Sequence, residues 1–79
     1  MPEPAEMIMA RLGAFNLALQ TQVLEKMYAV QEAKQDRAKN RKARNELRQM
    51  LIYLFYRGVI TAEEVEVLQH YRPQRHVPK

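Results

Sequence analysis

The chain has 79 residues, no cysteine, 47% hydrophobic residues and a formal net charge of +4. A chain of this length holds one small domain, and without cysteine it can form neither a disulfide nor a thiolate metal site. Its apolar content is too high for a disordered protein, while its longest apolar run, residues 50–56, is far shorter than the ~20 residues that span a bilayer. The sequence therefore predicts a single folded domain, residues 1–79, with no transmembrane segment.

The N-terminal segment, residues 5–30, carries an apolar stripe at helical spacing. Pro4 suits the start of a helix, and steps of three and four residues place the stripe on one face. Gly13 interrupts this helix at a cost of ~1 kcal/mol relative to Ala, so it marks either a close packing contact or a weak point. The stripe consists of Ile8, Leu12, Phe15, Leu19, Val23, Met27 and Val30.

The middle segment, residues 31–46, lacks the stripe but remains rich in helix-forming residues. Neither Gly nor Pro occurs between residues 14 and 57. One geometry is a continuous helix over 14–57, ~66 Å long at 1.5 Å per residue. The other is a chain bent near 38–45, at Asn40, whose apolar halves pack together in a three-helix fold. We favour the continuous helix, because helix–helix turns usually contain Gly, Asn, Ser or Pro and only Asn is present there.

The C-terminal segment predicts a helical hairpin. Gly58 occupies the left-handed position that ends a helix at Arg57. Thr61 and Glu64 have the spacing of a capping box, which starts a second, short helix over 61–72.

Two further points complete the expected all-α fold. Pro73 stops the short helix and leaves 73–79 as a tail. The run 50–56 is rich in strand-forming residues, but the helix-forming flanks and the caps favour a helix there as well.

A short pattern runs through this hairpin, from residue 47 to residue 71. The residues that carry it are Leu47, Leu51, Leu54, the turn Arg57-Gly58-Val59-Ile60-Thr61, and Glu63-Glu64. The pattern resembles the SHOCT-type (short C-terminal domain) helical hairpin found at the ends of many bacterial and phage proteins. It covers about a third of the chain and departs from the family at Val65, where an aromatic residue is common, and in lacking a lysine-rich second helix. The resemblance implies a small docking or oligomerisation element without established chemistry.

Residues suited to catalysis are sparse. The only histidines are His70 and His76, and the chain has no metal-ligand spacing, Gly-rich phosphate loop or Cys nucleophile. Glu63, Glu64 and Glu66 lie at the start of the short helix, where capping and the helix dipole account for them. We therefore expect no enzyme activity, no catalytic residue, no metal site and no cofactor.

Positive charge is concentrated in residues 34–44, which hold six Lys or Arg residues against one Asp, whereas the remaining residues sum to −1. On one helix, five cations at steps of three and four would share a face in a stripe ~21 Å long. Solvated helices usually alternate the sign of their charges, so this stripe predicts an acidic protein surface or nucleic-acid phosphates as its partner, with a merely solvated face as the plain alternative. The five cations are Lys34, Arg37, Arg41, Arg44 and Arg48.

A straight charged middle would keep the two apolar stripes apart, so another molecule would have to cover each of them. The sequence therefore predicts an assembly protein, either a homo-oligomer or a small subunit of a larger complex. The predicted apolar interface comprises Ile8, Leu12, Phe15, Leu19, Val23, Met27, Leu51, Leu54, Phe55, Val65 and Leu68.

The expected function is thus non-enzymatic protein–protein interaction, with the basic face docking on an acidic partner. A phage structural component or an inhibitor of a host factor fits this description. The alternative is non-specific nucleic-acid binding through phosphates. We expect neither a membrane nor a small-molecule substrate as partner. The acidic Glu3 and Glu6 differ from the basic start of a signal peptide, so we expect the protein in the cytoplasm or in a virion.

Overall fold

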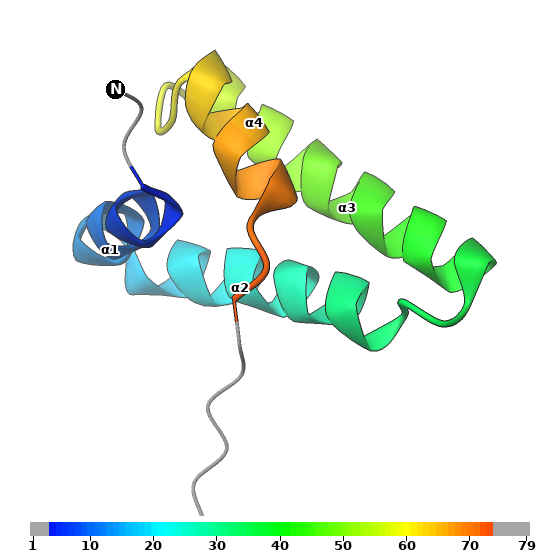
Figure 1. The fold of residues 1–79 in the computed structure, drawn as a ribbon. Helices are drawn as coiled ribbons and strands as arrows, with labels where there is room; N and C mark the ends of the chain where they lie inside the picture. Colours follow the sequence, from blue (N-terminus) through cyan, green and yellow to red (C-terminus); the bar gives the residue numbers. More distant parts are fainter. Residues whose placement is uncertain (1–3, 74–79) are drawn as a thin grey trace, which may run out of the picture.

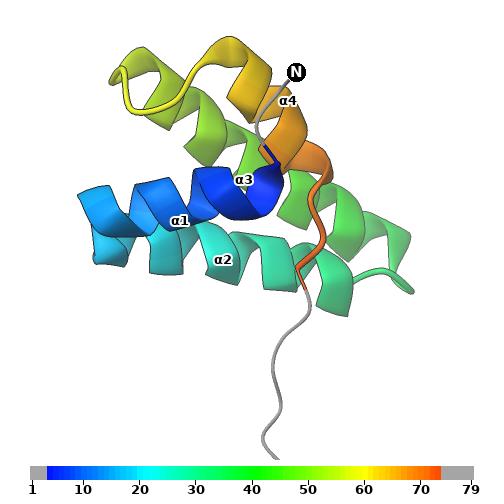
Figure 2. The same cartoon turned by 60° about the vertical axis from the view of Figure 1, so that its left-hand side comes forward.

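The computed structural model describes residues 4–73, which form four helices and no strand (Figure 1). The second and third helices are an antiparallel pair, the first folds back over the start of the second, and the fourth returns along the C-terminal half of the third (Figures 1 and 2). The all-α fold is confirmed, as is a long helix followed by a shorter C-terminal one. His76 and the rest of the predicted tail after Pro73 lie outside the described residues. The helices are α1 (Ala5–Phe15), α2 (Leu17–Glu32), α3 (Arg37–Tyr56) and α4 (Ala62–His70).

The chain reverses direction between α2 and α3, so the favoured continuous helix over 14–57 is wrong. Asp36 has an extended backbone, and its carboxylate accepts a hydrogen bond of 3.1 Å from the backbone N–H of Lys39. An aspartate in this position is an N-cap, which starts a new helix by satisfying a free backbone donor. The bend at Asn40 is also misplaced, because Asn40 lies inside the first turn of α3. Its amide donates to the carbonyl of Val30 at 3.0 Å and ties the start of α3 to the end of α2.

A second reversal, at Asn16, divides the predicted N-terminal helix into α1 and α2. The Asn16 side chain accepts a 3.2 Å hydrogen bond from the backbone N–H of Leu19 and so caps α2. The Gln20 amide then donates to the carbonyl of Met9 at 2.8 Å. A Cβ on Gly13 would collide with the side-chain amide of Gln20, so Gly13 is a close packing contact between α1 and α2.

The hairpin between α3 and α4 forms as predicted. Gly58 has a φ of +77°, and the backbone N–H of Val59 donates to the carbonyl of Leu54 at 2.9 Å. The N–H of Gly58 donates to the carbonyl of Phe55 at 3.0 Å, which completes a Schellman motif. The strand considered for residues 50–56 is absent, because this run lies inside α3.

The capping box of α4 is also present. The Glu64 carboxylate accepts from the backbone N–H of Thr61 at 2.9 Å, and the Thr61 hydroxyl accepts from the N–H of Glu64 at 3.1 Å. The helix ends at His70, and Tyr71 is extended.

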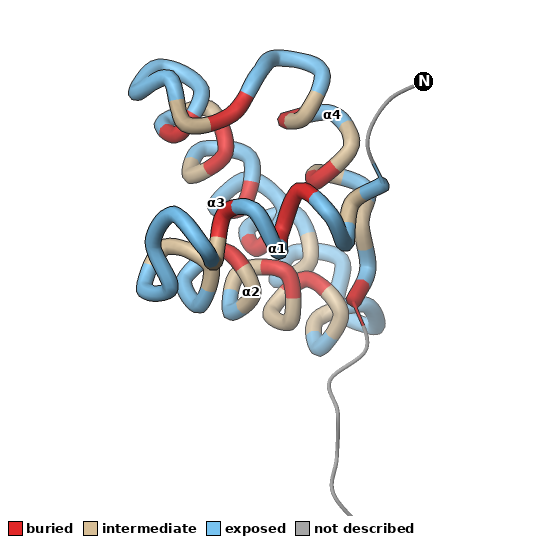
Figure 3. Tube along the Cα trace, turned by 90° about the vertical axis from the view of Figure 1, so that its left-hand side faces the viewer, coloured by how far each residue is buried: buried red, intermediate tan, exposed pale blue. Residues whose placement is uncertain are grey.

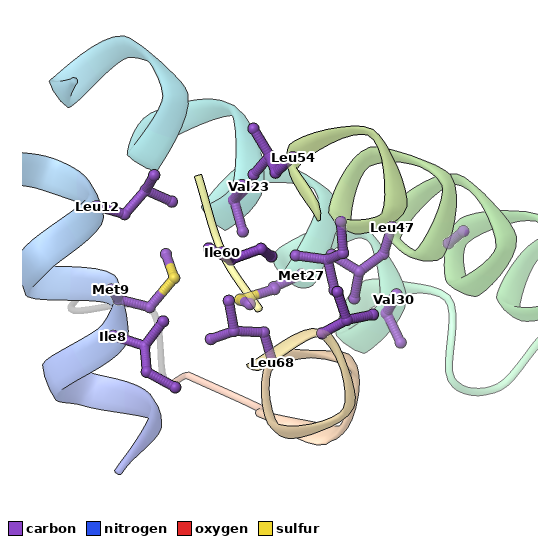
Figure 4. Close-up of a cluster of buried hydrophobic side chains, with 13 residues drawn as sticks. Ile8, Met9, Leu12, Val23, Met27, Val30, Leu47, Leu54, Ile60 and Leu68 are labelled. Carbon is purple, nitrogen blue, oxygen red and sulfur yellow. The ribbon is translucent and has the colours of Figure 1, made fainter. Parts of the chain in front are cut away.

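The two apolar stripes cover each other in one core that all four helices share (Figures 3 and 4). Each large apolar side chain buried in this way contributes about 1.5–3 kcal/mol to folding. The buried apolar residues are Ile8, Met9, Leu12, Val23, Met27, Val30, Ala43, Leu47, Leu51, Leu54, Ile60, Val65 and Leu68.

Most of the predicted apolar interface is therefore inside the molecule and cannot contact a partner while the protein is folded. Phe15 and Phe55 are exposed and Leu19 is partly buried. The prediction is wrong for the other eight, because the reversal at Asp36 lets the chain cover its own stripes. Those eight are Ile8, Leu12, Val23, Met27, Leu51, Leu54, Val65 and Leu68.

One ion pair joins the first helix to the last. The Arg11 guanidinium donates to the Glu64 carboxylate, whose side chain is only 12% exposed. Burial by itself raises the pKa of Glu64, but hydrogen bonds from Arg11 and Thr61 outweigh it and hold that pKa below its ordinary value of 4.5. The charged form of Glu64 therefore stabilises the contact between α1 and α4.

The variant Asp36→Ala tests the reversal between α2 and α3. We expect a loss of about 1 kcal/mol in the free energy of unfolding, measured by urea denaturation, because the N-cap of α3 is removed. The control Gln49→Ala, at an exposed position inside α3, should stay within about 0.5 kcal/mol of the parent. If residue 36 lay inside a continuous helix, Asp36→Ala would instead increase stability, since Ala has the higher helix propensity.

The variant Glu64→Gln tests the ion pair through its pH dependence. Because folding lowers the pKa of Glu64, the ionised carboxylate contributes its full stabilisation at neutral pH. The contribution is lost as the pH falls below the ordinary value of 4.5 and through the lowered pKa. We expect Glu64→Gln to cost about 1 kcal/mol at pH 7, because Arg11 is half exposed, and the difference from the parent to shrink as the pH falls below 4.5. The control Glu63→Gln, at an exposed position in the same turn, should cost less than Glu64→Gln at pH 7, and an equal cost of the two variants would refute the role of the pair.

Candidate polyanion-binding site

The basic face of the molecule lies on α3. At ~100° per residue, four arginines of this helix fall within ~60° of one another in a stripe ~17 Å long. All four are exposed, and none forms an ion pair with a described residue. Lys34 is not part of this helical stripe, because it lies in the turn before α3. The four are Arg37, Arg41, Arg44 and Arg48.

Two hollows lie along this face. Arg44 and Arg72 line both of them, so the hollows adjoin, and we call them together the basic groove. The first, of about 220 Å³, is lined by Arg41, Arg44, Asn45, Arg48, Gln69, His70 and Arg72. The second, of about 390 Å³, is lined by Val30, Gln31, Lys34, Asn40, Arg44 and Arg72.

The segment after α4 brings Arg72 to the groove. This segment runs from the end of α4 toward α2 (Figures 1 and 2). Pro73 is buried, and its carbonyl accepts a hydrogen bond from the Gln31 side chain of α2. The Arg72 guanidinium donates to the carbonyls of Gln69 at 2.9 Å and Tyr71 at 3.0 Å, which hold it at the end of α4, where it lines the groove together with the arginines of α3.

Tyr71 anchors this segment to the core. Burial is the main cause that raises the pKa of Tyr71 above its ordinary value of 10.0, and the nearby Glu6 and Tyr28 raise it further. The phenol is therefore neutral at physiological pH, and the segment adds no negative charge beside Arg72.

Within residues 4–73, no carboxylate lines the basic groove. Glu46, the acidic residue of α3, lies ~170° around the helix axis from the arginine stripe. Glu66 lies 4.0 Å from His70, with its side chain about three-quarters exposed. The groove therefore presents a concentrated positive charge that no neighbouring lining group cancels.

These side chains are suited to binding anions. Guanidinium groups form paired hydrogen bonds with carboxylates and phosphates, and the Asn45 and Gln69 amides both donate and accept. Among residues 4–73, no cluster of His or acidic side chains is arranged to hold a metal ion.

The sequence located only one wall of the groove. Arg41, Arg44 and Arg48 lie together as predicted, and Lys34 joins them from the turn. Arg37 shares the stripe but lines neither hollow. The sequence analysis did not identify Arg72 as a residue of the groove. Its position directly before the helix-stopping Pro73 was the one indication in the sequence, and that position does not reveal how the hairpin packs. His70 also lines the groove while remaining exposed.

Comparison of the chain with protein-family models, curated proteins and solved structures found no match. The resemblance of residues 47–71 to the SHOCT-type hairpin therefore stays a prediction. None of the helices in the described part of the chain has the length and apolar character needed to cross a membrane.

The buried stripes remove the original reason to expect self-association. A straight helix through the charged middle segment would have left each apolar stripe exposed unless another molecule covered it. In the observed fold, the two stripes cover each other within one chain. We expect light scattering at micromolar concentration to give the mass of one chain. A dimer that persists on dilution would show that the remaining exposed apolar residues, such as Phe15 and Tyr56, form an interface of their own.

Proposed function

We propose that this protein is a small, non-enzymatic docking protein that binds an acidic segment of a partner protein along the basic groove. One observation carries the proposal. Arg41, Arg44 and Arg48 of α3 meet Arg72, which comes from the far end of the hairpin, in a hollow that no carboxylate lines.

The fold gains little from this arrangement by itself. Like charges at helical spacing repel by a few tenths of a kcal/mol per pair. The core and the N-caps of α3 and α4 use none of these arginines. An anionic partner would remove the repulsion and form charge-assisted hydrogen bonds with the guanidinium groups.

The shape and lining of the groove favour a polypeptide. The groove lies beside α3, and Asn45 and Gln69 offer amide groups that match the donors and acceptors of a peptide backbone. His70 carries the one aromatic ring among the described residues that line the groove, so single-stranded bases would lack a stacking platform there. An extended chain with Asp or Glu side chains satisfies both the charges and the amides.

A second candidate, non-specific binding to nucleic acid, is favoured by the straight course of the arginine stripe. Successive arginines of α3 are ~4.5–6 Å apart along the helix axis and could contact successive phosphates. Such contacts would position the protein on the backbone without reading sequence.

The biological setting is part of the same proposal. The SHOCT-like pattern over residues 47–71 supports a docking role, and a component of a phage assembly or an inhibitor of a bacterial host factor fits a small protein of this kind. We place it in the cytoplasm or in a virion.

The variant pair Arg44→Gln with Arg72→Gln tests the groove. We expect it to weaken binding of a fluorescent twelve-residue Asp/Glu peptide at least about tenfold, measured by anisotropy, because both shared cations are lost. The control pair Lys39→Gln with Lys42→Gln removes the same charge from the other side of α3, and should weaken binding less than about threefold. Equal effects of the two pairs would mean that net charge alone attracts the peptide.

A fluorescent DNA duplex in the same assay distinguishes the two candidates. Contacts with five phosphates would give a log–log salt slope of about −4.5. If the duplex binds more tightly than the peptide at ~0.15 M salt with such a slope, the nucleic-acid candidate replaces the acidic segment. If neither ligand binds at low salt, the groove is only a solvated surface.

Circular dichroism of the triple variant Arg37→Gln, Arg41→Gln, Arg44→Gln should show unchanged helix content, since a loss of helix content would mean that the arginine stripe has a structural role.

A further inference from the structure

A second site lies at the other end of α3, between α1 and the turn that joins α3 to α4. This hollow has a volume of about 360 Å³ and shares no lining residue with the basic groove. We call it the apolar cleft. Its apolar walls are Ile8, Leu12, Phe15, Val59 and Ile60.

The cleft is apolar inside and incompletely covered at its edge. Ile8, Leu12 and Ile60 are buried, and they belong to the core. Phe15 is the last residue of α1 and is 67% exposed, although it lines the same hollow. An apolar occupant would take the Phe15 ring out of water while contacting walls that the fold has already fixed.

Two cations border this apolar surface. Arg11 is engaged by the Glu64 carboxylate, so its charge is already compensated. Arg57 has no carboxylate partner among the described residues, and its guanidinium carbon lies 6.0 Å from the centre of the Tyr53 ring. The cleft thus combines an apolar interior with one uncompensated positive charge, which complements an apolar body that ends in a single negative group.

The volume limits the size of the occupant. At ~30 Å³ per water molecule, 360 Å³ corresponds to about twelve molecules, and hence to a ligand of roughly a dozen heavy atoms. A helix is far larger, whereas pockets of about 300 Å³ or more that are mostly apolar and contain a few polar groups are typical of small-molecule sites.

We propose that the apolar cleft binds a small amphipathic carboxylate, such as a medium-chain fatty acid, with its carbon chain against Ile8, Leu12 and Phe15 and its carboxylate at Arg57. This binding is separate from the function proposed for the basic groove, and it differs from the expectation that the protein has no small-molecule ligand.

Titration with octanoate, followed through the amide resonances of the labelled protein, tests the site. We expect saturable shifts confined to residues 8–15 and 57–60, with half-saturation at roughly 0.1–1 mM for a ligand of this size. The neutral analogue 1-octanol has the same carbon chain and should bind at least about tenfold more weakly, because it cannot form the charge-assisted contact with Arg57.

Matched variants separate the cleft from general charge effects. Arg57→Gln should reduce the affinity for octanoate to that for octanol, while Arg48→Gln, which removes the same charge from the basic groove, should leave it unchanged. Phe15→Ala should weaken binding of both compounds, and the dispersed amide spectrum of each variant checks that it is folded.

Three outcomes would overturn the proposal. Shifts that do not saturate, or that spread over the whole surface, would indicate non-specific adsorption. Equal affinities of Arg57→Gln and Arg48→Gln for octanoate would remove the carboxylate contact. Binding of a short peptide with an apolar C-terminal residue and a free carboxylate, without binding of octanoate, would make the cleft a docking site for a protein terminus.

Discussion

The fold depends on the reversal of the chain between α2 and α3. If residues 33–36 continued as helix, the two apolar stripes would lie tens of ångströms apart and the core could not form. The Asp36 carboxylate, which caps α3, and the Asn40 amide, which bonds to the carbonyl of Val30, hold the turn in place. Two polar contacts, each of modest strength, therefore fix where the chain reverses, and the apolar core that packs between the helices stabilises the reversed arrangement.

Local rules predicted the C-terminal half of the fold better than the N-terminal half. Gly58, Thr61 and Glu64 act through contacts with residues three to five positions away, so their spacing alone was enough to predict the hairpin. Asn16 and Asp36 carry the same kind of information, but each lies in a helix-forming stretch without Gly or Pro. In such a stretch, packing of the core decides whether a cap residue interrupts the helix, and a periodic stripe looks the same on one helix as on two that fold back on each other.

The candidate site was only partly predictable for a related reason. Spacing along one helix shows which residues share a face, and this is why the arginines of α3 were found together. It does not show what lies opposite that face. Arg72 is distant from these arginines in sequence and reaches them only because α4 packs along α3 and Pro73 docks on α2. The groove therefore arises from tertiary packing, which places Arg72 and the end of α4 beside the arginines of α3. The density of charge along the sequence could not reveal this packing.

The helix α4 connects the two ends of the molecule. Glu64 in its first turn forms the ion pair with Arg11 of α1, beside the apolar cleft. Arg72, which lines the basic groove, follows directly after its last turn. With nine residues, the helix is ~14 Å long, so the Glu64 contact with α1 and the segment that carries Arg72 are only a few turns apart. If a ligand at one end of α4 shifts this helix, it also changes the geometry at the other end, and the effects of the two ligands on each other's affinity are then reciprocal.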